Sequence, residues 1–257
     1  MTANSHEWFA DESYWEMNRS FIWSDRRIEM SGTAVTRIMD LLGMKSGESV
    51  LDLACGFGRH SLLFAEHGLD VTGVDLNSAF IEEAKSKAIA ARQNIRFVRA
   101  DMREFKEPNS YGYIVLLYNS FGYFTDQEDD ERVLRNSFES LLPSGKMLIS
   151  VMGREINERL MSSKKDRTWW GEEGNYRLHE CVMNEDRSWA TIRMIILKGS
   201  DQQIFEYGVR LYSEPELVKS LTDAGFEDIQ TYGSLSGSRY DDEASGLHAV
   251  AAKPQDV

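Results

Sequence analysis

The chain of 257 residues is 42% hydrophobic and 28% charged, an ordinary globular composition that suits a single α/β domain. Its 42 acidic and 29 basic residues leave a formal net charge of −13 with no Lys- or Arg-rich run, so we expect no nucleic-acid partner. No segment approaches the roughly 18 apolar residues of a membrane span, and segment 1–15 lacks a secretory signal pattern. The two cysteines lie far apart in the sequence, which excludes a zinc ribbon and fits a cytoplasmic protein.

Residues 1–43 predict a helical N-terminal arm. Ser24 is placed to cap a helix that ends near Gly43. The apolar stripe of this helix comprises Ile28, Val35, Ile38, Leu41 and Leu42. The arm is also rich in aromatic side chains: Trp8, Phe9, Tyr14, Trp15, Phe21 and Trp23.

Strand and helix patterns then alternate. Short apolar strands are expected at 49–54, 70–74, 95–98, 113–117 and 146–151. Helices are expected between them at 58–67, 78–92 and 126–142, the last with acidic residues in its first turns. Buried strands joined by amphipathic helices predict a doubly wound, mostly parallel sheet covered on both faces.

The alternation is interrupted between residues 165 and 212. Strands at 176–183, 189–197 and 204–212 follow one another through short polar turns, which predicts an antiparallel β insertion. A helix at 213–224 and strands at 227–232 and 248–252 then complete the sheet. We therefore expect one domain over residues 1–257 that contains this insertion.

The sharpest local pattern is residues 50–60, VLDLACGFGRH, a strand followed by a glycine turn and a helix. Gly56 and Gly58 allow the backbone to approach a ligand, and the helix N-terminus offers N–H groups to it. A dinucleotide fingerprint would need a small residue at Ser61, which is tolerable, but Asp52 inside the strand points to another cofactor class. A turn without any ligand is the alternative.

Two later strands end in acidic residues. Asp75 closes the second strand, about 20 residues after the glycine turn, where a carboxylate accepts hydrogen bonds from ribose hydroxyls. Asp101 closes the third strand, where it could accept from an adenine amine while Met102 packs on the ring. Alternatively, Asp101 only caps the turn that follows it.

Residues 50–60, 71–76 (VTGVDL) and 100–102 (ADM) resemble the class I S-adenosylmethionine-dependent methyltransferases. Residues 118–124 (YNSFGYF) and 141–148 (LLPSGKML) extend the resemblance. It implies a Rossmann-like, seven-stranded sheet of order 3-2-1-4-5-7-6 with the last strand antiparallel. It also implies S-adenosylmethionine as cofactor, bound by Asp52, Ala54, Gly56, Gly58, Asp75, Leu76, Asp101, Met102 and Tyr118.

The helical arm and the β insertion are similar in arrangement to those of small-molecule N-methyltransferases. The similarity implies that the arm closes over the cofactor, with Tyr14 first and Arg27 second as candidates for its carboxylate, and that the insertion covers the substrate. Glu206, Arg210 and Tyr212 are expected on one strand face toward that substrate, with His179 nearby. The candidates for contact with the reacting groups are Tyr123, His179, Arg210 and Tyr212.

We therefore expect methyl transfer to a nitrogen or oxygen atom of a small molecule. A protein or RNA methyltransferase, a non-catalytic cofactor-binding protein of the same fold and a nicotinamide-dependent oxidoreductase are the alternatives. No metal site is expected, because His60, His67, His179 and His248 are scattered. The substrate, the acceptor atom, the choice between monomer and homodimer, and the mobility of the arm stay open.

Overall fold

A seven-stranded sheet forms the centre of the computed structural model, which describes residues 5–163, 167–172 and 174–256. Its strands have the order β10-β11-β5-β4-β1-β2-β3, and β11 runs antiparallel to both of its neighbours. The predicted fold class and strand order are thereby confirmed. The strands are β1 (Ser49–Leu53), β2 (Asp70–Asp75), β3 (Arg96–Arg99), β4 (Tyr111–Leu116), β5 (Leu141–Val151), β10 (Glu227–Tyr232) and β11 (Leu247–Ala252).

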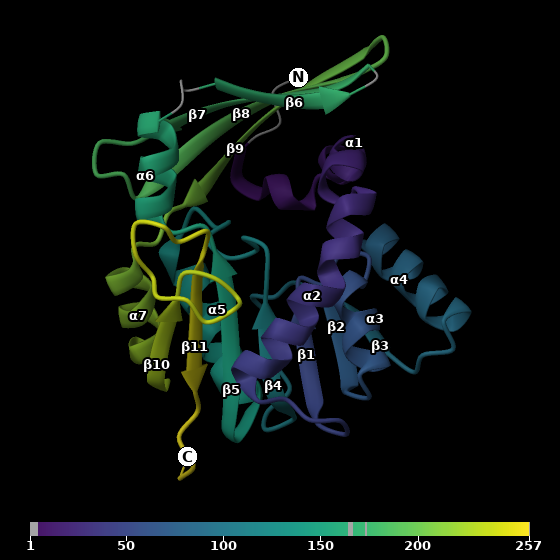
Figure 1. The fold of residues 1–257 in the computed structure, drawn as a ribbon, viewed down its shortest axis with the longest axis vertical. Coiled ribbons are helices and arrows are strands. Elements are labelled where there is room, and N and C mark those ends of the chain that lie inside the picture. Colours follow the sequence, from purple (N-terminus) through teal and green to yellow (C-terminus); the bar gives the residue numbers. More distant parts are fainter. Residues whose placement is uncertain (1–4, 164–166, 173, 257) are drawn as a thin grey trace.

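Helices cover both faces of this sheet (Figure 1). They are α2 (Asp25–Leu42), α3 (Arg59–Glu66), α4 (Ser78–Ala90), α5 (Gln127–Ser140) and α7 (Glu214–Asp223). Because its middle strands are covered on both faces, their side chains are apolar with little alternation: Val50, Leu51 and Leu53 of β1 are all at most 3% exposed.

The turn after β1 departs from ordinary backbone geometry at three positions. Ala54, Gly56 and Gly58 all have positive φ angles, of 59°, 57° and 73°. A Cβ atom on Gly58 would lie 2.9 Å from the ring of Phe97, so only glycine fits there. Helix α3 begins directly after Gly58, and its first backbone N–H groups therefore lie at the carboxyl end of β1.

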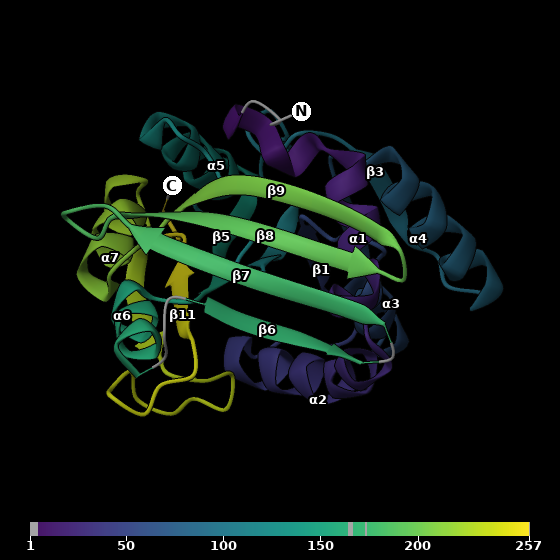
Figure 2. The same cartoon turned by 90° about the horizontal axis from the view of Figure 1, so that it is seen from above.

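A second sheet lies above the carboxyl ends of the central strands, as Figures 1 and 2 show from two directions. We call it the roof sheet (residues 167–210); it consists of β6 (Arg167–Glu172), β7 (Asn175–Met183), β8 (Trp189–Lys198) and β9 (Asp201–Arg210), all antiparallel. The sequence predicted three of these strands. The fourth, β6, is a short edge strand, and it follows α6 (Arg154–Ser163), which has no predicted counterpart. The expected start of the insertion at residue 165 lies outside the described residues.

The N-terminal arm consists of η1 (Ser5–Ala10) and α1 (Glu12–Ile22), followed by α2. Asp11 caps α1 through the Ser13 and Tyr14 amides, whereas Ser24 occupies the N-cap position of α2 without a side-chain hydrogen bond. The predicted stripe of α2 is wrong at Ile28, which is 51% exposed. Ser31 continues the buried stripe instead, because its hydroxyl donates to the Arg27 carbonyl at 2.7 Å.

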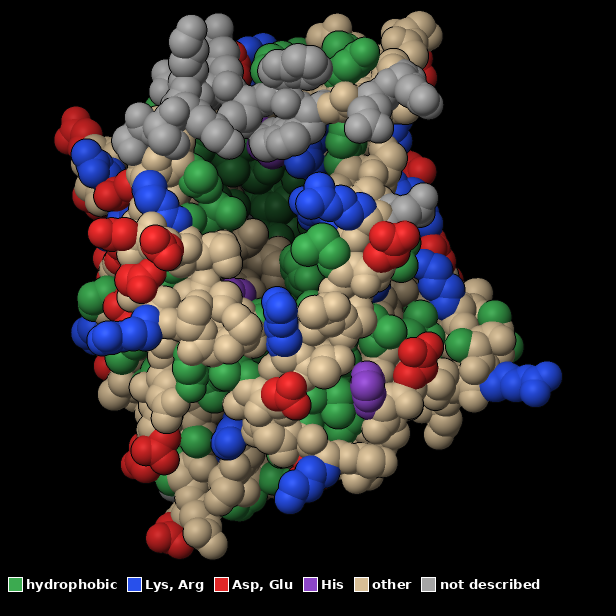
Figure 3. Space-filling view, in the orientation of Figure 1, with side chains coloured by type: hydrophobic (Ala, Val, Ile, Leu, Met, Phe, Trp, Pro, Cys, Tyr) green, Lys and Arg blue, Asp and Glu red, His purple; other side chains and the backbone are tan. Residues whose placement is uncertain are grey.

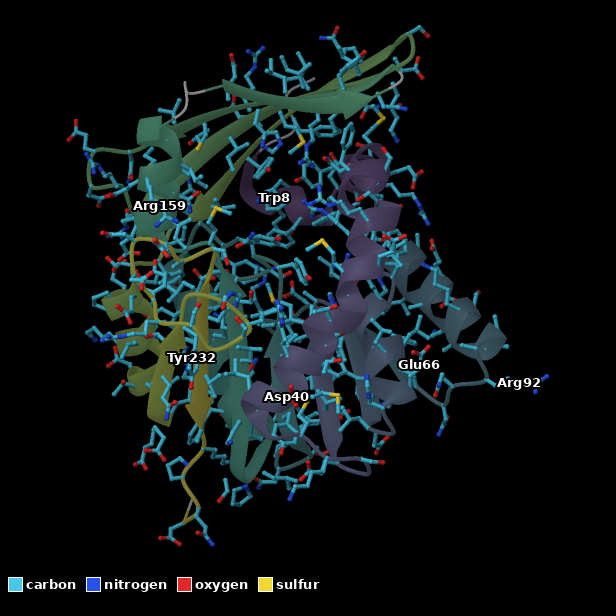
Figure 4. The ribbon with its side chains drawn as sticks, viewed as in Figure 1. Trp8, Asp40, Glu66, Arg92, Arg159 and Tyr232 are labelled. Atoms are coloured by element: carbon cyan, nitrogen blue, oxygen red, sulfur yellow. The ribbon has the colours of Figure 1, made fainter. Side chains whose placement is uncertain are left out.

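Aromatic side chains dock the arm under the roof sheet. Trp8, labelled in Figure 4, is 7% exposed and lies with its ring centroid 4.4 Å from that of Tyr207 on β9. Its indole Nε1 donates to the Gly208 carbonyl at 3.2 Å. Phe9 and Tyr14 are also buried. The arm and the roof sheet therefore enclose one space together with the central sheet.

Candidate functional site

A cavity of about 470 Å³ lies between the central sheet, the arm and the roof sheet. Figure 3 shows a hollow lined by hydrophobic side chains on this face, with Lys and Arg side chains at its rim. All the predicted cofactor residues except Gly58 line the cavity: Tyr14, Arg27, Asp52, Ala54, Gly56, Asp75, Leu76, Asp101, Met102 and Tyr118. The four candidates for the reacting groups line it as well: Tyr123, His179, Arg210 and Tyr212.

Asp75, at the end of β2, organises the glycine turn. Its Oδ2 accepts from the Gly56 amide at 2.8 Å, and its Oδ1 accepts from the Asn77 amide at 2.9 Å. Asn77 in turn caps α4 through the Ala79 and Phe80 amides. Burial raises the pKa of Asp75, while the amide hydrogen bonds oppose this shift. The carboxylate thus holds two backbone segments at the cavity and still has lone pairs for a ligand.

Asp52 lies on the floor of the cavity and is 2% exposed. Burial raises its pKa to about 7, against the hydrogen bond that Ser61 Oγ donates to its Oδ2 at 2.6 Å. Ser61, which occupies the small-residue position of the dinucleotide fingerprint, therefore serves the Asp52 carboxyl here. This pairing could not be predicted from the sequence, because it depends on how α3 is oriented relative to β1.

Asp101, after β3, combines a place at the cavity with the predicted role as a cap. It lines the cavity, and its Oδ1 accepts from the Arg103 amide at 2.8 Å, which caps the turn. Burial tends to raise the pKa of Asp101, but the hydrogen bonds from Arg103 hold it below its usual value. Asp101 is therefore an ionised acceptor at the edge of the cavity.

His60 is a cavity residue that the sequence did not single out. Its ring stacks on Tyr118 with centroids 5.0 Å apart, and the Arg59 guanidinium lies 4.8 Å from the same Tyr118 ring. Burial, reinforced by Arg59, lowers the pKa of His60 to about 3. Within the described part of the chain, His60 Nε2 and Arg59 Nε are buried without a hydrogen-bond partner. Their position in the sequence was the available signal, because Arg59 and His60 begin the helix that follows the glycine turn.

The upper part of the cavity is aromatic. Trp8 lies 4.6 Å from Tyr123 and 4.4 Å from Tyr207, measured between ring centroids. Burial raises the pKa of Tyr123, of Tyr207 and of Tyr14 above the ordinary value, so all three hydroxyls stay protonated. Burial also lowers the pKa of His179 to about 4, which makes its imidazole neutral at pH 7 and a poor proton acceptor.

Arg210 and Tyr212 are arranged differently from the prediction. Strand β9 ends at Arg210, and Glu206 is exposed, so these three side chains do not form one face toward the cavity. Instead, Arg210 Nε and the Tyr212 hydroxyl donate to Oδ2 of the fully buried Asp130, at 3.2 and 3.0 Å. The aromatic face of β9, with Tyr207 and Val209, contributes to the cavity.

The residues present fit S-adenosylmethionine. Carboxylates at the ends of β2 and β3 are available for hydroxyl and amine groups, and apolar side chains flank them. The unpartnered nitrogens of His60 and Arg59, together with the start of α3, offer polar contacts to an amino-acid end. In the described ranges, no group of three or more His, Cys, Asp or Glu side chains is arranged to hold a metal ion, and no helix is long and apolar enough to cross a membrane.

Comparison with known sequences gives a consistent result. A family model described as a methyltransferase domain matches residues 50–145. YqeM of Bacillus subtilis (strain 168), named as a methyltransferase, is 34% identical over 103 residues, which are 40% of this chain and only 41% of that protein. The C-methyltransferase UbiE of Yersinia enterocolitica is 28% identical over 77% of this chain and 74% of its own length. The glycine/sarcosine N-methyltransferase of Aphanothece halophytica is 25% identical over 79% of this chain and 76% of its own length.

Solved structures show the same fold. An S-adenosylmethionine-dependent methyltransferase from Clostridium acetobutylicum ATCC 824 has a TM-score of 0.78 at 13% identity, over 94% of this chain and 98% of that one. The sugar N-methyltransferase KedS8 from Streptoalloteichus sp ATCC 53650 has a TM-score of 0.66 at 19% identity, over 99% of both chains. Its strand order and glycine turn are those of the class I methyltransferase fold, and its residues 50–145 match a methyltransferase domain.

Proposed function

We propose that the protein transfers the methyl group of S-adenosylmethionine to a nitrogen or oxygen atom of a small molecule held beneath the roof sheet. The observation that carries this proposal is the cavity itself, which joins the ends of β1, β2 and β3 to an aromatic compartment under β9. Its walls come from the arm and the roof sheet, so an acceptor must fit inside. This enclosure favours a small molecule over a folded protein or an RNA. We also infer a cytoplasmic location from the low cysteine content.

Each part of the cavity receives a role in this proposal. Asp75 accepts from the ribose hydroxyls with Leu76 beside the adenine, and Asp101 and Met102 bracket the base. Asp52 and the backbone from Ala54 to Gly58 hold the methionine part. Tyr14, Arg27, Arg59 and His60 surround its amino-acid end, and the Tyr118 ring contacts Arg59 and His60 there.

The bound cofactor supplies a methyl carbon already activated by its sulfonium, so the protein has to align the acceptor and exclude water. Tyr123 and Tyr207 stay protonated and can donate hydrogen bonds that orient the acceptor. His179, neutral and with its pKa lowered to about 4, contributes as a hydrogen-bonding group rather than as a general base. An acceptor amine would therefore react in its neutral form. The UbiE similarity makes a carbon acceptor the rival outcome.

Calorimetry and methyl transfer test the proposal in sequence. Titration with S-adenosylmethionine, S-adenosylhomocysteine and NAD⁺ should show binding of the first two only. Incubation with methyl-labelled cofactor and fractionated metabolites, proteins and RNA should then place the label in a small amine or alcohol. Label on a carbon atom or in a macromolecule would replace the proposed acceptor, and binding without any transfer would favour a non-catalytic protein.

A further inference from the structure

Arg103 joins three separate segments of the chain beside the cavity. Its Nε lies 3.1 and 3.0 Å from the two carboxylate oxygens of Asp101, and its Nη2 lies 2.6 Å from Oδ2 of that residue. The same guanidinium donates to Asp129 in the first turn of α5 at 3.2 Å and to Glu7 in η1 at 2.9 Å. One cation therefore links the end of β3, a core helix and the N-terminal arm.

Arg103 also contacts the aromatic residues of this region. Its guanidinium carbon lies 5.7 Å from the ring centroid of Phe9 in the arm and 4.7 Å from that of Phe124. Phe9, Phe124 and Asp101 all line the cavity, whereas Arg103 lies behind them with a side chain that is 19% exposed. Arg103 thus supports the cavity wall where the arm meets the end of β3.

The geometry fixes the direction in which Asp101 accepts hydrogen bonds. A carboxylate has about four acceptor positions, and the Arg103 side chain and amide occupy part of them. The planar guanidinium fork holds the carboxylate plane in a way that an ammonium group does not. The remaining lone pairs are then presented to the cavity in one orientation.

We propose that Arg103 is a positioning residue that couples the base end of the cofactor site to docking of the N-terminal arm. It orients Asp101 toward the exocyclic amine of adenine and, with the same guanidinium, holds η1 through Glu7. The proposal rests on the proposed role of Asp101 at the base. Because coupling is reciprocal, a cofactor that engages Asp101 stabilises the docked arm, and a docked arm raises cofactor affinity.

Binding of S-adenosylhomocysteine and of S-inosylhomocysteine, which lacks the amine, provides the test. Wild type should prefer S-adenosylhomocysteine by at least tenfold. Arg103→Lys keeps the charge but loses the fork, so it should reduce this preference to about threefold or less. A merely structural defect would weaken both ligands equally. Glu7→Gln should weaken S-adenosylhomocysteine by roughly twofold to fivefold at low salt, since Glu7 is exposed.

The matched control is Glu83→Gln, which breaks the ion pair of Arg19 with Glu83 (2.5 Å) and so loosens α1 from α4 without touching Asp101. It should leave the preference between the two ligands unchanged. Hydrogen exchange of segment 7–22 should slow on addition of S-adenosylhomocysteine in wild type and less in Arg103→Lys. Unchanged preference and unchanged protection in Arg103→Lys would overturn the coupling. Failure of wild type to bind S-adenosylhomocysteine would instead overturn the proposed function.

Discussion

Replacement of Asp75 by alanine tests the cofactor site most directly. The carboxylate holds the Gly56 amide at 2.8 Å and the Asn77 amide at 2.9 Å, and it is proposed to accept from the ribose hydroxyls. A hydrogen bond to a charged group typically contributes about 1.5–3 kcal/mol. Loss of one such net contact to the ribose therefore lowers affinity roughly 10- to 150-fold. Loosening of the glycine turn acts in the same direction.

Isothermal titration of wild type and Asp75→Ala with S-adenosylhomocysteine measures this loss. Asp70→Ala is the matched control, because Asp70 begins the same strand but is exposed and lies away from the cavity. It should bind like wild type. A urea unfolding curve for each variant shows whether the chain is still folded. If folded Asp75→Ala binds within about threefold of wild type, the ribose assignment is wrong.

Three further outcomes are expected. Tyr207→Phe should lower turnover at least tenfold with S-adenosylhomocysteine affinity nearly unchanged, because Tyr207 lies in the aromatic compartment. Tyr176→Phe, at an exposed position of β7, is its control, and an equal loss of turnover in both variants would contradict a role of Tyr207 in orienting the acceptor. Trp8→Ala should cost about 3–5 kcal/mol in unfolding free energy, since the ring is 7% exposed; a loss below about 1 kcal/mol would show that the arm is not part of the core. Burial lowers the pKa of His248 from its usual 6.5 to about 4, so its stabilising contribution is present above pH 6.5 and is lost as the pH falls toward 4. Between pH 7 and pH 5 the unfolding free energy of wild type should fall by about 2 kcal/mol more than that of His248→Asn, as measured by urea unfolding at both pH values. Equal decreases in the two proteins would contradict this.

Whether the arm opens stays a prediction. Trp8, Phe9 and Tyr14 are buried against the body, which is the arrangement of a docked segment. Hydrogen exchange decides between a docked segment and a lid, because a lid gains protection only when cofactor is added. Strong protection without ligand would place the arm in the permanent core.

The sequence predicted the central sheet, and most residues that it proposed for the cofactor line the cavity, because the signals for both are local. A strand, a glycine turn and a helix fix where residues 50–60 lie relative to one another, and parallel strands bring Asp75 and Asp101 to the same edge. Strand order followed from the family resemblance. The other inferences need only neighbouring residues or the common end of a sheet.

The remaining contacts join residues that are far apart in the chain. Arg210 and Tyr212 bond to Asp130, about 80 residues earlier, and nothing in the alternation of β9 marks that partner. Tyr207 and Val209 on β9 received no role from the sequence, yet both line the cavity. The missed edge strand β6 has only six residues and pairs on one side. Periodicity defines faces, but only packing decides what each face meets.

The place of β11 in the sheet has a consequence for biosynthesis. This strand is the last in the chain, yet it lies between β5 and β10 rather than at an edge. A chain emerging from the ribosome therefore carries the glycine turn and all the acidic residues of the cavity long before its sheet can close. Until residues 247–252 have left the exit tunnel, β5 and β10 expose unpaired edges, and such edges recruit other chains. Chaperone contact with the nascent protein should consequently persist until residues 247–252 have emerged and paired with both strands.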